Sequence, residues 1–199
     1  MGRPLSNLKP FDNNFSEAKP DVYHAGALSS ILPRVDTTRP AAPNFFVEGK
    51  SSQGRVEVAK RKVKHHGAFG AQAMHELQNY GAAEPEYDNK ARRFTAAYHA
   101  GTSTLQTYAT HITAPLTPGG EPECRTTETK GFDLTNDRET FVQGATTYRN
   151  SRDLAKTKRD RTIDHANQVA GRISASSPNK LHDQLHIPFD GSYCRIGHL

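Results

Sequence analysis

The chain has 199 residues, of which 34% are hydrophobic and none is tryptophan, and its formal net charge is +5. A positive charge of this size permits an anionic partner but does not demand one. No segment approaches the ~18 consecutive apolar residues of a membrane span, and no apolar signal-peptide region follows Met1. The composition therefore argues against membrane insertion and secretion. It predicts an intracellular protein of the nucleus or cytoplasm, in which both cysteines, Cys124 and Cys194, are reduced thiols.

The distribution of apolar residues divides the chain into three parts. Residues 1–18 are polar and show little periodicity, so we expect a disordered lead. Residues 19–172 carry the apolar patterns of one domain of ordinary size. Residues 173–199 contain serine, asparagine and proline without a regular apolar pattern, which predicts a flexible tail.

The first two predicted strands come early in the domain. Residues 19–26 form a short candidate strand, with Val22 and Tyr23 as its β-forming residues. Residues 44–50, with the sequence NFFVEGK, begin with an apolar run that favours a buried strand in the middle of the sheet. Serine and glycine in residues 51–54 then predict a tight turn.

A long amphipathic helix is predicted over residues 55–80. Apolar or small residues recur there at steps of three and four, which places them on one side of a helix: Val56, Ala59, Val63, Gly67, Gly70, Met74 and Leu77. Because Gly67 and Gly70 lie within this stripe, we expect the helix to approach the sheet closely there. His65 and His66 are expected on the solvated face. That face also carries a basic surface: Lys60, Arg61, Lys62 and Lys64.

A β-hairpin follows the helix. Residues 92–99 and 104–112 are rich in threonine and aromatic side chains, and the segment between them contains glycine, which favours a turn. A further short strand is expected within residues 124–134.

A second helix is predicted over residues 137–172. Asp137 is a plausible N-cap, because an acidic side chain accepts hydrogen bonds from the amides of the first turn. The apolar stripe of this helix fades after Ala155, so we expect its far half to project into solvent. The order of strands and helices predicts a mixed α/β domain, in which a central mixed sheet is flanked by the two helices.

The candidate site combines Asp21, which follows Pro20, with Glu48 and Lys50 at the end of the predicted central strand. Two carboxylates can hold Mg²⁺ through hard oxygen ligands, and the metal then activates water for phosphodiester hydrolysis. Lys50 lies two residues after Glu48, so on a strand it shares the same face and can orient that water. The alternative is a solvated glutamate and lysine at a strand end, because such short motifs also arise by chance.

The sequence resembles an uncharacterised fungal protein family that is similar in turn to the PD-(D/E)XK, or restriction-endonuclease-like, nuclease fold. The resemblance spans about residues 19–172, and these segments carry it: Pro20-Asp21, NFFVEGK, VAKRKVKHHGAFGA, LQNYG, YHAGT and TFVQGATTYRNSRDLAK. It implies a restriction-endonuclease-like core, nucleic acid as the partner and Mg²⁺ as the cofactor. By this resemblance Asp21 and Glu48 are metal ligands and Lys50 is the catalytic lysine.

The chain departs from that family at two places. Lys62 stands where relatives tend to carry a glutamine that points at the site, and a cation there would compete with a metal for the carboxylates. Relatives also have a helix before the first strand, so the resemblance implies that the domain is shortened at its N-terminus.

Two functions are therefore expected from the sequence. The first is a nuclease-like protein with Mg²⁺-dependent phosphodiester hydrolysis at a partly decayed site, in which Lys62 belongs to the catalytic group. The second is a non-catalytic module that binds nucleic acid or protein through the basic helix, with Lys60, Arg61 and Lys64 as the contacting residues.

Overall fold

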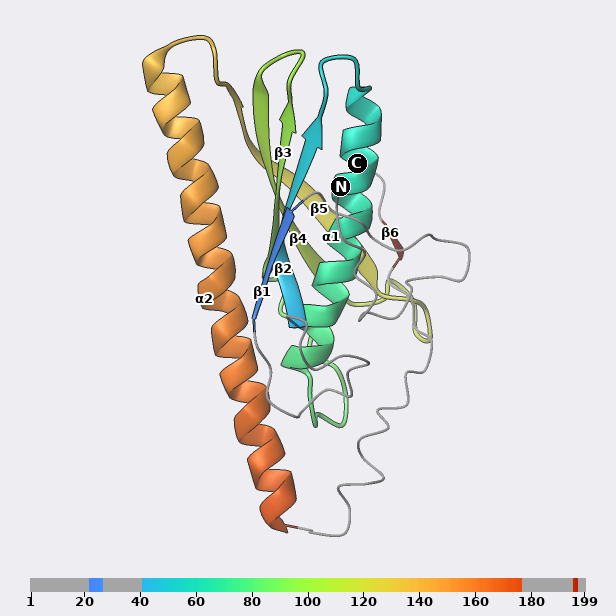
Figure 1. The fold of residues 1–199 in the computed structure, drawn as a ribbon. Coiled ribbons are helices and arrows are strands. Elements are labelled where there is room, and N and C mark those ends of the chain that lie inside the picture. Colours follow the sequence, from blue (N-terminus) through green and yellow to red (C-terminus); the bar gives the residue numbers. More distant parts are fainter. Residues whose placement is uncertain (1–21, 27–40, 177–194, 197–199) are drawn as a thin grey trace.

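The computed structural model describes residues 22–26, 41–176 and 195–196 (Figure 1). The predicted disordered lead and Asp21 thus lie outside the described residues. A β-sheet occupies the middle of the molecule, with helix α1 (Val56–Gln78) on one side and helix α2 (Arg138–Ser176) on the other. The two helices cover opposite faces of the sheet, so each face contributes to a buried core.

The strands of the described chain form one mixed sheet of six strands, in sequence order. They are β1 (Val22–Gly26), β2 (Ala41–Lys50), β3 (Arg93–His99), β4 (Thr104–Thr113), β5 (Glu123–Asp133) and β6 (Arg195–Ile196). β2 and β3 run parallel because α1 connects them, whereas β1–β2, β3–β4 and β4–β5 are antiparallel. The predicted mixed α/β architecture, the inner position of β2 and the hairpin of β3 and β4 are confirmed.

Helix α1 packs on the sheet through the predicted stripe, with Val63, Met74 and Leu77 buried. Its two glycines meet the sheet as expected. A Cβ atom at Gly70 would lie 2.7 Å from Cε2 of Phe46 and 2.9 Å from the carbonyl oxygen of Pro43, closer than real Cβ contacts. Glycine at this position lets the helix axis approach β2, which places the side chains of α1 directly over the site strand.

Helix α2 begins as predicted, because Asp137 caps it. The backbone amide of Thr140 donates to Oδ1 of Asp137 over 2.7 Å, and this bond lowers the pKa of the Asp137 carboxyl. The expected projection of the far half of the helix into solvent is wrong. Ile163 and Ala166 are buried against Met74 and Leu77 of α1, because the apolar stripe resumes beyond the charged segment of residues 156–161.

The charged segment of α2 itself faces the protein through Arg159. This side chain is only 6% exposed, and its Nη1 atom lies 3.4 Å from Oδ1 of Asn44 on β2. The Asn44 amide in turn donates to the carbonyl oxygen of Ala155 over 2.7 Å. A long arginine stem packs like an apolar side chain while its head binds a polar partner, so the sequence pattern hides this contact.

Cys124 corrects another expectation. It lies in β5 next to the short parallel strand β6, where Cys124 pairs with Ile196. Cys124 is buried and disulfide-bonded, so the prediction of a reduced thiol is wrong. The other cysteine of the chain, Cys194, lies outside the described residues. Within the described segments, no helix combines the length and the apolar character that a membrane span requires.

Candidate functional site

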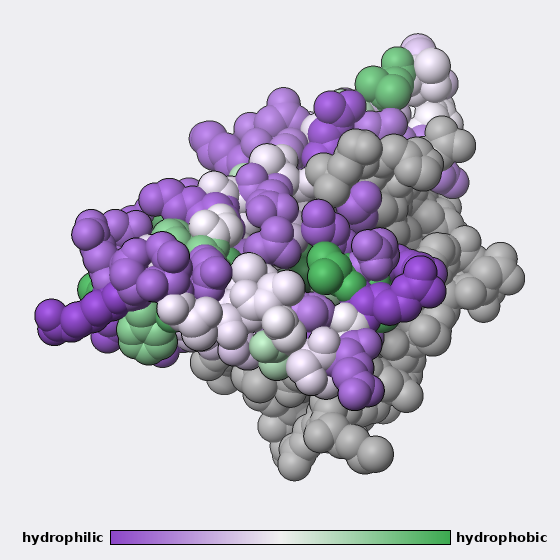
Figure 2. Space-filling view, turned by 90° about the horizontal axis from the view of Figure 1, so that it is seen from above, coloured by the Kyte–Doolittle hydropathy of each residue, from purple (hydrophilic) through white to green (hydrophobic). Residues whose placement is uncertain are grey.

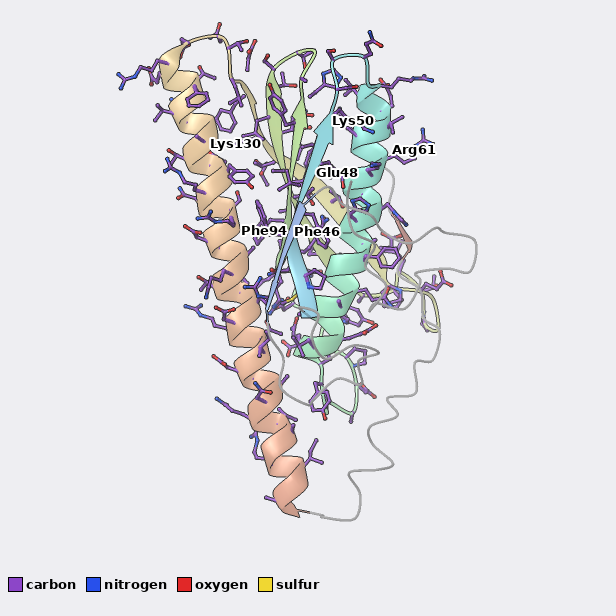
Figure 3. The ribbon with its side chains drawn as sticks, viewed as in Figure 1. Phe46, Glu48, Lys50, Arg61, Phe94 and Lys130 are labelled. Atoms are coloured by element: carbon purple, nitrogen blue, oxygen red, sulfur yellow. The ribbon has the colours of Figure 1, made fainter. Side chains whose placement is uncertain are left out.

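Glu48 is the centre of the candidate site. It lies on the inner strand β2, two residues after Phe46, and both side chains point between the strand and α1 (Figure 3). The Glu48 side chain is 0% exposed. A carboxylate that is removed from water in this way is stable as an anion only if positive charge or hydrogen-bond donors surround it.

Two residues of α1 supply that environment. The Lys62 ammonium lies 3.6 Å from Oε2 of Glu48, with the lysine side chain 39% exposed, and Nδ1 of His66 contacts Oε1. Lys62 and His66 are four residues apart and therefore lie one above the other on the helix. Lys62 thus reaches the carboxylate.

The expected solvated position of His66 is wrong, because His66 is buried against Glu48. A signal for this position existed in the sequence. Residues 62, 66 and 70 form one line at steps of four, and Gly70 belongs to the predicted buried stripe. Its neighbour His65 packs edge-on against Phe69. Burial, together with the nearby His66, lowers the pKa of His65 to about 4, and the charge of Glu48 opposes this shift.

Arg93, a further basic side chain, lies in the same region and was missed by the sequence analysis. Arg93 begins β3 and is fully buried. Its Cζ atom lies 4.3 Å from the centre of the Phe46 ring. Burial lowers the pKa of Arg93 well below its usual range, and the negative charge of Glu48 opposes that shift.

Lys50 lies at the end of β2, beyond Glu48 (Figure 3). Its side chain runs beside the turn before α1, since a Cβ atom at Gly54 would be 3.1 Å from Cδ of Lys50. Within the described residues Lys50 forms no ion pair with Glu48. Asp21 lies outside those residues. It immediately precedes Val22, and Val22 pairs with Val47, the neighbour of Glu48.

The basic surface of α1 is only partly free in the structure. Lys60 and Arg61 are exposed, whereas Lys62 and Lys64 are half-buried. Arg61 points away from the sheet in Figure 3. The end of the molecule at which β2 stops and α1 begins is mostly hydrophilic, with hydrophobic side chains only in small separate groups (Figure 2).

The comparisons give no relative. No protein-family model matches the chain, and no curated protein and no solved structure is significantly similar to it.

The side chains around Glu48 can be compared with the ligands that Mg²⁺ prefers. Mg²⁺ prefers oxygen ligands in near-octahedral geometry. The described side chains around Glu48 are instead an ammonium, an imidazole and a guanidinium, and this part of the chain holds no group of three ligating side chains. These residues do not fit Mg²⁺, because the positive charges of Lys62 and Arg93 already compensate the only carboxylate among them. No hydrolytic step through a metal can be derived from them.

Proposed function

We propose that this chain is a nuclease-like protein with a restriction-endonuclease-like core, in which the site for phosphodiester hydrolysis is partly lost. Three features support the proposal. β1 and β2 are adjacent antiparallel strands, β2 ends in Glu48-Gly49-Lys50, and α1 lies over this strand with Lys62 directed at Glu48. These are the positions that the resemblance to the PD-(D/E)XK fold assigns to the hydrolytic site.

The observation that carries the proposal is the pairing of Glu48 with Lys62. In an active site of this kind, Glu48 and Asp21 would hold Mg²⁺ and Lys50 would orient the attacking water. Here the Lys62 ammonium lies 3.6 Å from Glu48, so a metal must displace a cation that the fold already provides. We therefore propose that metal-dependent cleavage is weak.

Cleavage of end-labelled DNA and RNA in Mg²⁺ or Mn²⁺ tests this function. We expect slow cleavage by the native protein and its loss in Glu48→Gln and Lys50→Met, which remove the proposed ligand and the water-orienting group. Lys130→Met is the matched control, because Lys130 is exposed on β5 (Figure 3). Equal cleavage by the native protein and Glu48→Gln would show that the activity does not come from this site.

The second candidate function is a non-catalytic nucleic-acid-binding module. The exposure of Lys60 and Arg61 on α1 favours it, because phosphate contacts need accessible cations. Fluorescence anisotropy with short DNA and RNA at increasing salt concentration tests it. We expect an affinity that falls with salt and depends little on sequence, since phosphate contacts release counterions and do not read bases. An affinity that does not change with salt would contradict phosphate binding by the basic helix.

A further inference from the structure

Arg93 is the largest fully buried side chain in the described part of the chain. Helix α1 leaves room for it by means of its two glycines. A Cβ atom at Gly67 would lie 3.0 Å from Nη1 of Arg93, and a Cβ atom at Gly70 would lie 3.0 Å from its Cγ. A side chain at either position would therefore be in tight contact with the arginine. The slot under α1 is thus shaped around this side chain.

The contacts of the Arg93 guanidinium do not offset the free energy that its burial costs. Nη1 lies 3.5 Å from Oγ1 of Thr110, at the limit of a hydrogen bond, and Nε and Nη2 have no hydrogen-bond partner among the described residues. The Phe46 ring lies under the guanidinium and offers a favourable but limited cation–π interaction. Burial of a charged side chain costs a large desolvation free energy unless an opposite charge lies near it.

Glu48 provides the opposite charge. It is the only fully buried acidic residue of the described chain, and it is separated along β2 by one residue from Phe46, on which the guanidinium lies. Among the described residues Arg93 and Glu48 form no direct ion pair, and they act on each other through the Phe46 region between them: the Glu48 charge raises the pKa of Arg93 against the effect of burial. Each group therefore reduces the free energy that burial of the other requires.

We propose that Arg93 is a positioning residue of the Glu48 site, which supplies from within the fold the positive charge that a divalent cation would otherwise bring to this carboxylate. This role of Arg93 rests on the proposed function in one respect, namely that the Glu48 site once held a metal. Lys62 provides the accessible part of the replacement charge and Arg93 the buried part. The carboxylate thus stays in place without metal.

A double-mutant cycle on the full chain tests the charge pairing. The cycle compares Glu48→Gln, Arg93→Met and the double variant by chemical denaturation. We expect Arg93→Met to lower the folding equilibrium constant at least about tenfold more in the native background than in the Glu48→Gln background. Arg159→Met is the matched control, because Arg159 is also buried but binds Asn44. The effects of Arg159→Met and Glu48→Gln should add, and additive effects for Arg93 would overturn the proposal.

The cycle remains informative if Arg93→Met does not fold. Folding of the double variant would then support the pairing, because the unpaired Glu48 charge is removed. If the double variant also fails to fold, Arg93→Lys replaces Arg93→Met, since lysine keeps the charge. We then expect Arg93→Lys to be more stable in the native background than in the Glu48→Gln background. The same stability in both backgrounds would overturn the pairing.

Stabilisation by Mn²⁺ provides a second measurement, because the loss of packing around Arg93 would not by itself create a response to the metal. Millimolar Mn²⁺ should raise the thermal midpoint of the folded Arg93 variant more than that of the native protein, and this gain should disappear when Glu48→Gln is added. Equal shifts in the native and Arg93 variants would overturn the replacement of a cation by Arg93. Neither assay uses nucleic acid, so failure of the proposed nuclease or binding function would be seen separately.

Discussion

Lys62 and Glu48 face each other across the contact between α1 and β2, with the Lys62 ammonium 3.6 Å from Oε2 of a carboxylate that is 0% exposed. The pair is asymmetric. The glutamate cannot leave its position on the inner strand, whereas the lysine, at 39% exposed, can turn toward solvent. A metal can therefore approach Glu48 only when the Lys62 side chain turns away from the carboxylate toward solvent.

We predict that Lys62→Gln raises the affinity of the protein for Mg²⁺, because glutamine removes the competing charge and offers an oxygen ligand. Isothermal titration calorimetry of the two proteins measures the difference. Lys60→Gln is the matched control, since Lys60 is exposed on the same helix and forms no ion pair in the described structure. An unchanged affinity in Lys62→Gln would mean that Lys62 does not protect Glu48 from metals.

Gly70→Ala should destabilise the protein. The added Cβ atom would lie 2.7 Å from Phe46 and 2.9 Å from a backbone oxygen, and overpacking of this kind typically costs about 1–3 kcal/mol. Gly171→Ala in α2 is the control, because no atom lies within 4 Å of its added Cβ. That variant should gain about 0.5–1 kcal/mol of stability from helix propensity. Urea unfolding separates the two, and a stabilised Gly70→Ala would contradict the close packing.

Exchange of Lys60 and Lys64 for glutamate should weaken nucleic-acid binding to a similar degree for every sequence tested. The reason is that phosphate contacts carry no sequence information. The dependence of log K on log salt should also become shallower, by roughly 0.9 for each lost contact with duplex DNA. Anisotropy titrations measure both effects. Lys130→Glu, with the exposed lysine on β5, should change binding less, and an equal loss would mean that only net charge matters.

The Asp88–Arg92 ion pair predicts an acid-dependent contribution to stability. The Arg92 guanidinium binds Asp88 through contacts of 2.6 and 2.8 Å and lowers the pKa of this carboxyl to about 2. Because the folded pKa lies below the unfolded value of about 3.9, the contribution is complete above that value and is lost as the pH falls toward about 2. Asp88→Asn should therefore lower the thermal midpoint at pH 7. A difference that persisted unchanged at the lowest pH would argue against the ion pair.

The disulfide of Cys124 predicts sensitivity to reductant. Removal of a native disulfide typically costs about 2–5 kcal/mol, so dithiothreitol should lower the denaturation midpoint of the native protein. Cys124→Ala should start from the lower midpoint and show no further effect of reductant. Disulfides are rare in cytosolic proteins. The redox state of Cys124 in the cell therefore also tests the intracellular location that the sequence predicts.

Local patterns determined the elements of this fold. The steps of three and four in α1, the glycine-containing turn between β3 and β4, and the Asp137 cap all act within a few residues, so they can be read along the chain. The position of Glu48 on a buried inner strand followed from the same kind of pattern. The structure shows Lys62 and Glu48 as an ion pair, whereas the family resemblance that placed Lys62 at a hydrolytic site stays a prediction.

Only the tertiary structure decided which charged groups are buried. Arg93 and its neighbour Arg92 look alike in sequence, yet Arg93 fills the slot left by Gly67 and Gly70, whereas Arg92 binds the loop residue Asp88. His66 could not be assigned for the same reason, because its partner Glu48 lies on another element. Burial of a charge depends on what the fold places opposite it, and such a partner can be distant in the chain.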